Sequence, residues 1–249
     1  MGESATGSGV QSLNRAFALI EAVTGAGGYM SIREMADATG FPQPTVHRLI
    51  KTLVERGYMR QLPDRRYALG FRLIPLGAAA NQLVGVGVER ALGELVRELG
   101  ETANLAVLAG DSAEYVAQVP SRHSVRMFTE VGRRVDLHAT GVGKALLARL
   151  ANDEVDAIVR RTGLPPRTSH TIATTIGLHA ALDVIRSNGY ALDEQEQELG
   201  VRCVAVAVPT SKPVNMAVSV SGPLTRMDDA LVARAVPLLR AAAQALSGD

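Results

Sequence analysis

The sequence predicts an α+β protein built from two domains. Its 249 residues exceed the usual size of a single domain, and 47% of them are apolar, as in ordinary globular proteins. Helical periodicity dominates the first seventy residues, whereas β-prone segments joined by turns alternate with helices beyond Gly100. We therefore expect a flexible tail (1–9), a helical domain that ends in a hairpin (10–72), linker helices (73–100) and a domain with one antiparallel sheet (101–249).

Composition and charge narrow the classes of function. The single cysteine, Cys203, cannot form an internal disulfide, and the first nine residues lack the basic and apolar segments of a signal peptide. We therefore expect a cytoplasmic protein that does not contact a membrane. Aromatic residues make up only 4% of the chain, which argues against modules that stack bases on aromatic rings. Seven basic and two acidic residues between positions 41 and 72 indicate a polyanionic partner.

Two helices are predicted before residue 41. Apolar residues recur at helical spacing after Ser12, a good N-cap residue, and this helix should end before Gly27. Ser31 and Glu34 have the spacing of a capping box, in which each side chain accepts a hydrogen bond from the backbone of the other. The second helix should therefore begin at Ser31 and end at Gly40.

The third predicted helix carries the strongest functional signal. Its apolar residues form one stripe (Val46, Leu49, Ile50, Leu53 and Val54). Its opposite face is polar and basic, with Gln43, Thr45, His47, Arg48 and Lys51. Two short helices joined by a glycine-containing turn are typical of a helix-turn-helix, whose second helix enters the major groove of DNA. We expect Thr45, His47, Arg48 and Lys51 to face that groove. Gln43 should contact DNA as well.

A hairpin should follow the third helix. Residues 58–62 and 67–70 are β-prone, and the segment Pro63-Asp64-Arg65-Arg66 between them is a turn sequence. A hairpin in this place is the wing of a winged helix-turn-helix, and Arg65 and Arg66 at its tip should contact phosphates or the minor groove. The alternative is a small protein-interaction domain, but basic residues on both the helix and the hairpin favour duplex DNA.

The rest of the chain mixes helices and strands. Helices are expected at 73–80, 88–99, 143–150, after a cap at Asn152 or Asp153, at 175–188 and at 228–246; strands are expected at 103–108, 114–119, 125–131, 190–193, 201–208 and 214–220. The linker is either a plain spacer or a helix that pairs with its copy in a second subunit. We favour pairing through the linker and the first helix, because two helix-turn-helix units must be held one DNA turn apart.

Ordered motifs along nearly the whole chain resemble the IclR family of bacterial transcriptional regulators. The motifs of the DNA-binding half are Arg15-Ala16-Phe17, Ser31–Glu34, Pro44-Thr45-Val46-His47-Arg48-Leu49, Leu53–Tyr58 and Tyr67-Ala68-Leu69-Gly70. Those of the second half are residues 132–148, Gly189–Glu196, Gly200–Ala205 and Ser219–Pro223. Asp136 is a departure, since the family usually has proline before Leu-His-Ala, and it should alter the loop that borders the pocket.

The resemblance implies a regulator of operator DNA with a GAF-like sensor domain, no cofactor, and homodimers that often pair into tetramers. It also implies a pocket for a small-molecule effector, lined by Met127, Gly141, Val142, Asp193, Val201, Cys203, Ser219 and Ser221. Ser219 and Ser221 are two apart on a strand and therefore share a face. Hydroxyls on that face, with the amides of Gly141 and Val142, could bind an organic acid.

Other chemistries remain open for the same residues. Gly141–Lys144 lacks both the spacing and the Ser/Thr of a phosphate-binding loop, so it is either a seat for a carboxylate or a simple tight turn. The alternation of its strand predicts that Cys203 is a small core residue. Asp193 follows a strand and is predicted to be a solvated residue or the cap of a turn. The alternatives for the whole protein are a hydrolase-type enzyme that uses Cys203 with His138, and a regulator that binds metal through His138, Asp193 and Cys203.

Overall fold

The computed structural model describes residues 10–84, 87–127, 130–209 and 214–247. It divides into two compact units, Met1–Ala80 and Asn81–Asp249. Within the described part of the chain, no helix is both long and apolar enough to cross a bilayer.

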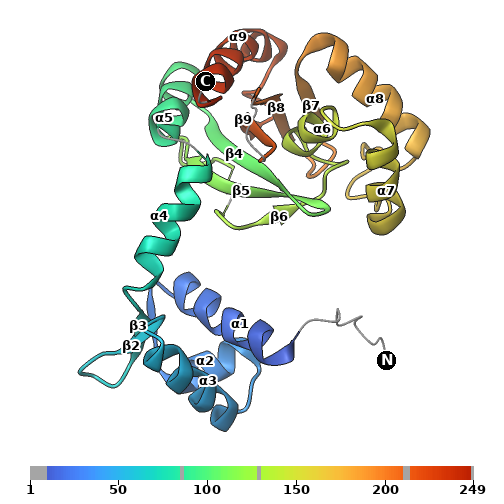
Figure 1. The fold of residues 1–249 in the computed structure, drawn as a ribbon. Coiled ribbons are helices and arrows are strands. Elements are labelled where there is room, and N and C mark those ends of the chain that lie inside the picture. Colours follow the sequence, from blue (N-terminus) through green and yellow to red (C-terminus); the bar gives the residue numbers. More distant parts are fainter. Residues whose placement is uncertain (1–9, 85–86, 128–129, 210–213, 248–249) are drawn as a thin grey trace. The chain divides into compact units, whose positions relative to one another are not determined.

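The first unit is a three-helix core with a small sheet (Figure 1). Its elements are α1 (Gln11–Gly25), β1 (Tyr29–Met30), α2 (Ile32–Thr39), α3 (Gln43–Glu55), β2 (Met59–Gln61) and β3 (Tyr67–Leu69). The three helices bury Leu19, Met35 and Ile50 against one another. Strand β3 pairs antiparallel with both β2 and β1, so the predicted hairpin becomes a three-stranded sheet with a two-residue strand that was not predicted.

Local chemistry explains how two of these helices begin. The Ser31 Oγ accepts from the Glu34 amide at 3.2 Å, and the Glu34 carboxylate accepts from the Ser31 amide at 2.7 Å, so the predicted capping box is confirmed. The prediction that Ser12 is the N-cap of α1 is wrong. That position belongs to Val10, and no side chain caps the helix. The buried residues of this helix, Leu19 and Val23, lie in its second half, whereas Phe17 in the first half is exposed.

The second unit is one antiparallel sheet between two layers of helices (Figure 1). Its strands are β4 (Thr102–Ala109), β5 (Ser112–Val119), β6 (Arg134–Val135), β7 (Ala191–Glu194), β8 (Val201–Ala207) and β9 (Met216–Pro223), in the order β6-β5-β4-β9-β8-β7. Its helices are α5 (Val88–Leu99), α6 (Gly141–Leu147), α7 (Asn152–Thr162), α8 (Thr175–Asn188) and α9 (Asp229–Leu246). The predicted α+β class is confirmed.

The helices α5 and α9 cover one face of the sheet, and α6, α7 and α8 cover the other. Alternation along each strand decides which side chains meet which layer. On β9, Val218 and Val220 belong to the core formed with α5 and α9, whereas Ala217 belongs to the core formed with α6 and α8. Ser219 and Ser221 therefore lie on the α6 side of the sheet.

The predicted linker helices separate into two different elements. Helix α4 (Leu73–Val84) spans the boundary between the two compact units. Helix α5 ends at Gly100 as predicted, but its apolar residues Leu92, Leu95 and Leu99 are buried against the sheet. This stripe therefore cannot pair with a second subunit, because the chain's own sheet already covers it.

Two other predictions in this unit are wrong. No strand occurs among the described residues of 125–131, and Val125 and Val131 are exposed. The adjoining edge of β5 is instead paired by residues 132–135, since the Tyr115 amide donates to the Arg133 carbonyl. Neither Asn152 nor Asp153 caps α7. Its N-cap is Ala151, whose amide donates to the Glu154 carboxylate at 3.0 Å.

Candidate functional site

Helix α3 presents a polar, exposed face opposite its buried stripe. Val46, Ile50 and Leu53 are buried, which fixes the rotation of the helix about its axis. Gln43, His47, Arg48 and Lys51 are consequently exposed, and Thr45 is half-buried. The one ion pair that reaches this face among the described residues joins Lys51 to Glu55 at 4.0 Å. At such exposure that pair contributes little to stability and leaves the lysine available to a partner.

The two arginines of the wing have different surroundings. Arg66 is held, because its Nε donates to Asp64 at 2.6 Å and its guanidinium lies 4.2 Å from the centre of the Tyr29 ring. Arg65 is exposed and adopts a positive φ of 67°, an uncommon conformation for a residue other than glycine. The turn therefore places Arg65 at the tip of the wing and uses Arg66 to brace it.

In the second unit, six of the eight predicted effector residues surround one cavity. These are Met127, Gly141, Asp193, Val201, Cys203 and Ser221, and the cavity has a volume of about 50 Å³. Val142 is instead packed in the core behind α6, and Ser219 is wholly buried behind the cavity wall. The residues that complete the lining were not singled out from the sequence: Tyr115, Arg133, Val135, Thr140, Gln197 and Glu198.

Close packing of α6 on β8 closes one side of the cavity. A Cβ at Gly141 would lie 3.0 Å from the Cys203 sulfur, so a side chain at this position would have to displace that sulfur. Thr140 caps the helix by accepting from the Gly143 amide at 3.1 Å. A Cβ at Gly143 would lie 2.3 Å from the Leu137 carbonyl oxygen. The Gly-x-Gly sequence is thus explained by a tight turn that brings α6 against the sheet.

A polar band crosses the α6 side of the sheet at the level of the cavity. It consists of Thr102 and Asn104 on β4, Gln118 on β5, Asp193 on β7, Cys203 on β8, and Ser219 and Ser221 on β9. Asp193 pairs across the strands with Cys203, and Cys203 pairs with Ser221. The alternation on β4, β8 and β9 places these residues on one face, and the order of the strands places them side by side.

Burial changes the acid–base properties of this band. Desolvation raises the pKa of Asp193 to about 7, and the neighbouring Glu196 carboxylate acts in the same direction. Hydrogen bonds from the Glu196 and Gln197 amides to Asp193 oppose that change. Desolvation, together with Asp193, raises the pKa of the Cys203 thiol to about 12. The thiol therefore stays protonated at neutral pH and is a weak nucleophile.

Lys144 and Glu196 form an ion pair beside Asp193. Both side chains are almost completely buried, and the ammonium donates to the Glu196 carboxylate. Lys144 lies on α6, whereas Glu196 lies in the segment between β7 and β8, so the pair ties the helix to the rim of the cavity. The lysine of the Gly141–Lys144 motif is thus engaged within the protein.

His138 does not meet Cys203 in the described structure. Its Nε2 lies 3.1 Å from the Pro165 carbonyl oxygen, and it lines a separate small cavity with Asp136. The described residues also contain no group of three histidine, cysteine or acidic side chains that could hold a metal ion. Asp136 accepts from the Arg167 guanidinium and does not line the 50 Å³ cavity.

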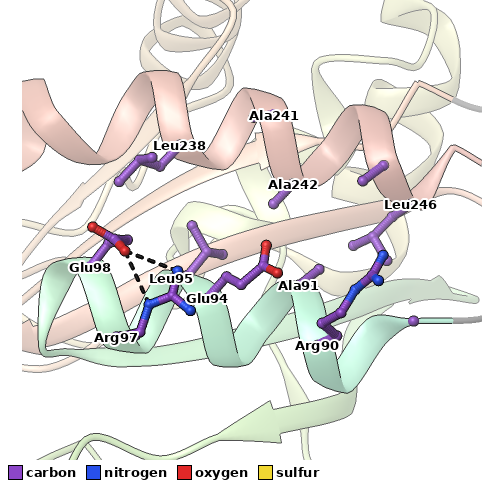
Figure 2. Close-up of a pocket in the computed structure, with 12 residues that line it drawn as sticks. Arg90, Ala91, Glu94, Leu95, Arg97, Glu98, Leu238, Ala241, Ala242 and Leu246 are labelled. Atoms are coloured by element: carbon purple, nitrogen blue, oxygen red, sulfur yellow. Dashed lines mark hydrogen bonds and ion pairs between the residues drawn. The ribbon is translucent and has the colours of Figure 1, made fainter.

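A larger hollow of about 320 Å³ lies on the other side of the sheet, between α5 and α9 (Figure 2). Its floor is apolar, with Leu95 and Ala242, and its charged rim is exposed. Figure 2 shows the rim pair formed by Arg97 and Glu98, in which the guanidinium donates to the carboxylate at 3.0 Å. None of the residues predicted to bind an effector lines this hollow.

Comparisons with known proteins agree on a family. Residues 12–63 match the IclR helix-turn-helix domain, and residues 82–248 match the C-terminal domain of the bacterial transcriptional regulator IclR. The chain is 34% identical to the transcriptional repressor IclR of Escherichia coli over 227 residues, which cover 88% of this chain and 82% of the relative.

Solved structures of relatives have the same fold. The IclR crystal structure from Thermotoga maritima has a TM-score of 0.75 at 26% identity, covering 95% of this chain and 97% of that one. An IclR homologue from Microbacterium hydrocarbonoxydans, solved with 4-hydroxybenzoate, has a TM-score of 0.77 at 20% identity, covering 95% and 98%. The chain described here therefore belongs to the IclR family of bacterial transcriptional regulators.

Proposed function

We propose that this regulator binds operator DNA through α3 and the wing, and that a small organic acid bound in the 50 Å³ cavity changes its affinity for DNA. The DNA-binding part of the proposal rests on the exposed, basic face of α3, which lies opposite the buried residues Val46, Ile50 and Leu53. A helix with this arrangement can enter the major groove while its other face stays in the core.

Different residues serve different parts of the duplex. Arg48 can contact guanine with two donors, and Gln43, Thr45 and His47 can bond to base edges. Lys51 and Arg65 suit phosphates, which supply affinity without reading sequence. Arg66 is held by Asp64 and Tyr29 and supports the wing. It contacts the DNA backbone only through the guanidinium N–H groups that do not bond to Asp64.

The size and chemistry of the cavity point to a two- or three-carbon acid. A volume of about 50 Å³ suits only a small ligand, such as glycolate with its five non-hydrogen atoms. Arg133, Ser221 and a protonated Asp193 offer donors to a carboxylate, and Met127, Val201 and the Gly141 backbone surround the carbon frame. The ligand in the structure of the Microbacterium homologue, 4-hydroxybenzoate, is also an organic acid.

We propose that the acid leaves the site unchanged, so that the protein is a sensor rather than an enzyme. A thiol nucleophile needs a depressed pKa and an adjacent base. Cys203 has a raised pKa, and the His138 ring bonds to a backbone carbonyl instead. No cofactor is needed for binding alone. As a regulator of DNA, the protein would act in the cytoplasm.

We further propose a homodimer, which can pair into a dimer of dimers. Val10, Leu13 and Phe17 recur along α1 with exposed fractions of 63%, 56% and 59%. On α4, Ile74 and Leu76 are exposed in the same way. The exposed apolar stripe at the start of α1 and the exposed apolar side chains of α4 indicate contact with another protein surface, and a second copy would hold two α3 helices at a fixed spacing.

The experiment that tests the DNA half selects duplexes from a random library with the full chain and measures their dissociation constants by fluorescence anisotropy. Arg48→Ala should raise the dissociation constant by about 5- to 150-fold, equivalent to about 1–3 kcal/mol. Arg33→Ala removes another exposed arginine of the same unit, which pairs with Asp37 on α2, and should leave the affinity nearly unchanged. Equal effects of both variants, or affinity insensitive to salt, would refute this interface.

The effector half is tested by titrating glycolate into the complex of protein and selected duplex. The expected result is a change in DNA affinity and a rise in melting temperature of the free protein, with glycolate recovered unchanged. Conversion of glycolate by the purified protein would contradict the sensor assignment.

A further inference from the structure

A buried asparagine, Asn104, and a half-buried glutamine, Gln118, lie behind Ser221. Asn104 on β4 is 1% exposed and does not line the cavity. Its Nδ2 donates to the Ser221 Oγ at 3.3 Å, and its Oδ1 accepts from the Gln118 Nε2 at 3.2 Å. Both polar atoms of the Asn104 amide are therefore bonded in a place that water does not reach, which fixes its orientation.

These bonds form a chain with one direction, from Gln118 through Asn104 to Ser221. At each step a group accepts from the residue behind it and donates to the residue ahead. A serine hydroxyl has one proton to donate, and that proton is not used by Asn104, because the amide already donates to the hydroxyl oxygen. Ser221 lines the cavity, so its O–H is left to donate to whatever occupies the cavity.

We propose that Asn104 is a positioning residue that makes Ser221 a hydrogen-bond donor to the effector, so that the site selects a ligand with an acceptor oxygen at this point. This inference rests on the proposed function, and it adds the reason why a carboxylate or carbonyl is preferred there. Gln118 holds the Asn104 amide in the donating orientation. Neither residue touches the ligand, so each acts only through Ser221.

The test uses glycolate and its amide, glycolamide, as probes, with affinities measured by calorimetry on the full chain. Ser221→Ala should weaken glycolate about 10-fold, the usual value of one hydrogen bond. Asn104→Leu, which keeps the approximate volume, should weaken it by a similar factor. Gln118→Met should weaken glycolate binding about 3-fold. This substitution removes the hydrogen bond that orients the Asn104 amide, and it does so at a position that is only half-buried.

Asn104→Asp separates positioning from packing. An aspartate here accepts from Ser221, so the hydroxyl turns its lone pairs toward the cavity and the preference for glycolate over glycolamide should fall. In a Ser221→Ala background, the Asn104 and Gln118 substitutions should have no further effect, whereas a general loss of structure or a repulsive charge would persist. The melting temperature of each variant reports its folding.

The outcomes separate the two hypotheses. If Ser221→Ala weakens glycolate but folded Asn104→Leu and Gln118→Met bind it as the wild type does, the positioning role is wrong and the effector site stands. If the Asn104 variants do not fold, the loss of the Gln118→Met effect in the Ser221→Ala background supports the proposal, and its persistence overturns it. If the wild type binds neither probe, the organic-acid assignment itself fails, and the inference fails with it.

Discussion

The two faces of the six-stranded sheet are both covered by helices, yet they are built from different side chains. Toward α5 and α9, the strands present residues such as Leu105, Val204 and Val218, all fully buried and apolar. Toward α6, at the same level, they present the polar band, including Asn104 and Ser221. The alternation of each strand lets one sheet carry both surfaces.

The difference separates the apolar packing that stabilises the sheet from the polar face to which we assign ligand recognition. Buried apolar side chains add about 25 cal/mol for each square ångström removed from water, while a buried polar group without a partner costs about 1–3 kcal/mol. The hollow between α5 and α9 is the larger one, but its charged groups remain in solvent. The small cavity beside α6 is the one backed by buried polar side chains, as a selective site requires.

The largest expected effect comes from the ion pair of the polar side. Lys144→Met should lower the free energy of unfolding by about 3–5 kcal/mol, because it leaves the Glu196 carboxylate buried without its partner. Urea unfolding followed by circular dichroism measures this. The double variant Lys144→Met with Glu196→Leu should recover most of the loss, and a single variant within about 1 kcal/mol of wild type would show that Glu196 can reach solvent.

A deletion on the apolar side should cost nearly as much but leave the site intact. Leu105→Ala removes a fully buried side chain and should lower the free energy of unfolding by about 2–4 kcal/mol, with glycolate affinity unchanged. Leu199→Ala provides the control, since Leu199 is 62% exposed and should shift stability by less than about 0.5 kcal/mol. A large loss of glycolate affinity in Leu105→Ala would mean that the two faces are coupled.

Asp193 should give the polar side a distinctive dependence on pH. Its pKa is raised to about 7 in the folded chain from 3.8, so between these values the folded chain holds a proton that the unfolded chain releases. The stability contributed by this group therefore falls as the pH rises from about 4 to about 7, and is constant above. Relative to Asp193→Asn, the wild type should lose about 4 kcal/mol of unfolding free energy across this range, measured by urea unfolding at each pH. If the unfolding free energies of the two proteins changed with pH in parallel, the Asp193 carboxyl would be solvated in the folded chain.

Much of this arrangement was predictable from sequence wherever a signal was local. The Ser31–Glu34 capping box, the glycine that ends α2 and the stripe of α3 each depend on residues within one or two helical turns. Alternation on β9 predicted that Ser219 and Ser221 share a face. The same signal was present on β4, where Thr102 and Asn104 alternate with apolar residues, and it could have identified Asn104.

The remainder depends on contacts between distant segments. Strand β1 and strand β6 have two residues each and exist only because a longer strand provides an edge to pair with. The predicted strand at 125–131 had suitable residues, but residues 132–135 occupy the edge of β5 instead. That pairing brings Arg133 to the wall of the cavity, and no residue spacing in the sequence predicts this position.

The smallest effect compares the same substitution at two positions of the polar band. The Ser219 hydroxyl is fully buried and has no hydrogen-bond partner of normal geometry in the described structure, whereas Ser221 accepts from Asn104. Ser219→Ala should therefore leave the free energy of unfolding unchanged or raise it by up to about 1 kcal/mol, while Ser221→Ala should lower it by about 1 kcal/mol because the Asn104 amide loses its acceptor. Thermal and urea unfolding of the two variants, side by side, measure the difference. If Ser219→Ala is the more destabilising of the two, its hydroxyl has a partner in solution, such as an ordered water, and the polar band extends one row deeper than the cavity wall.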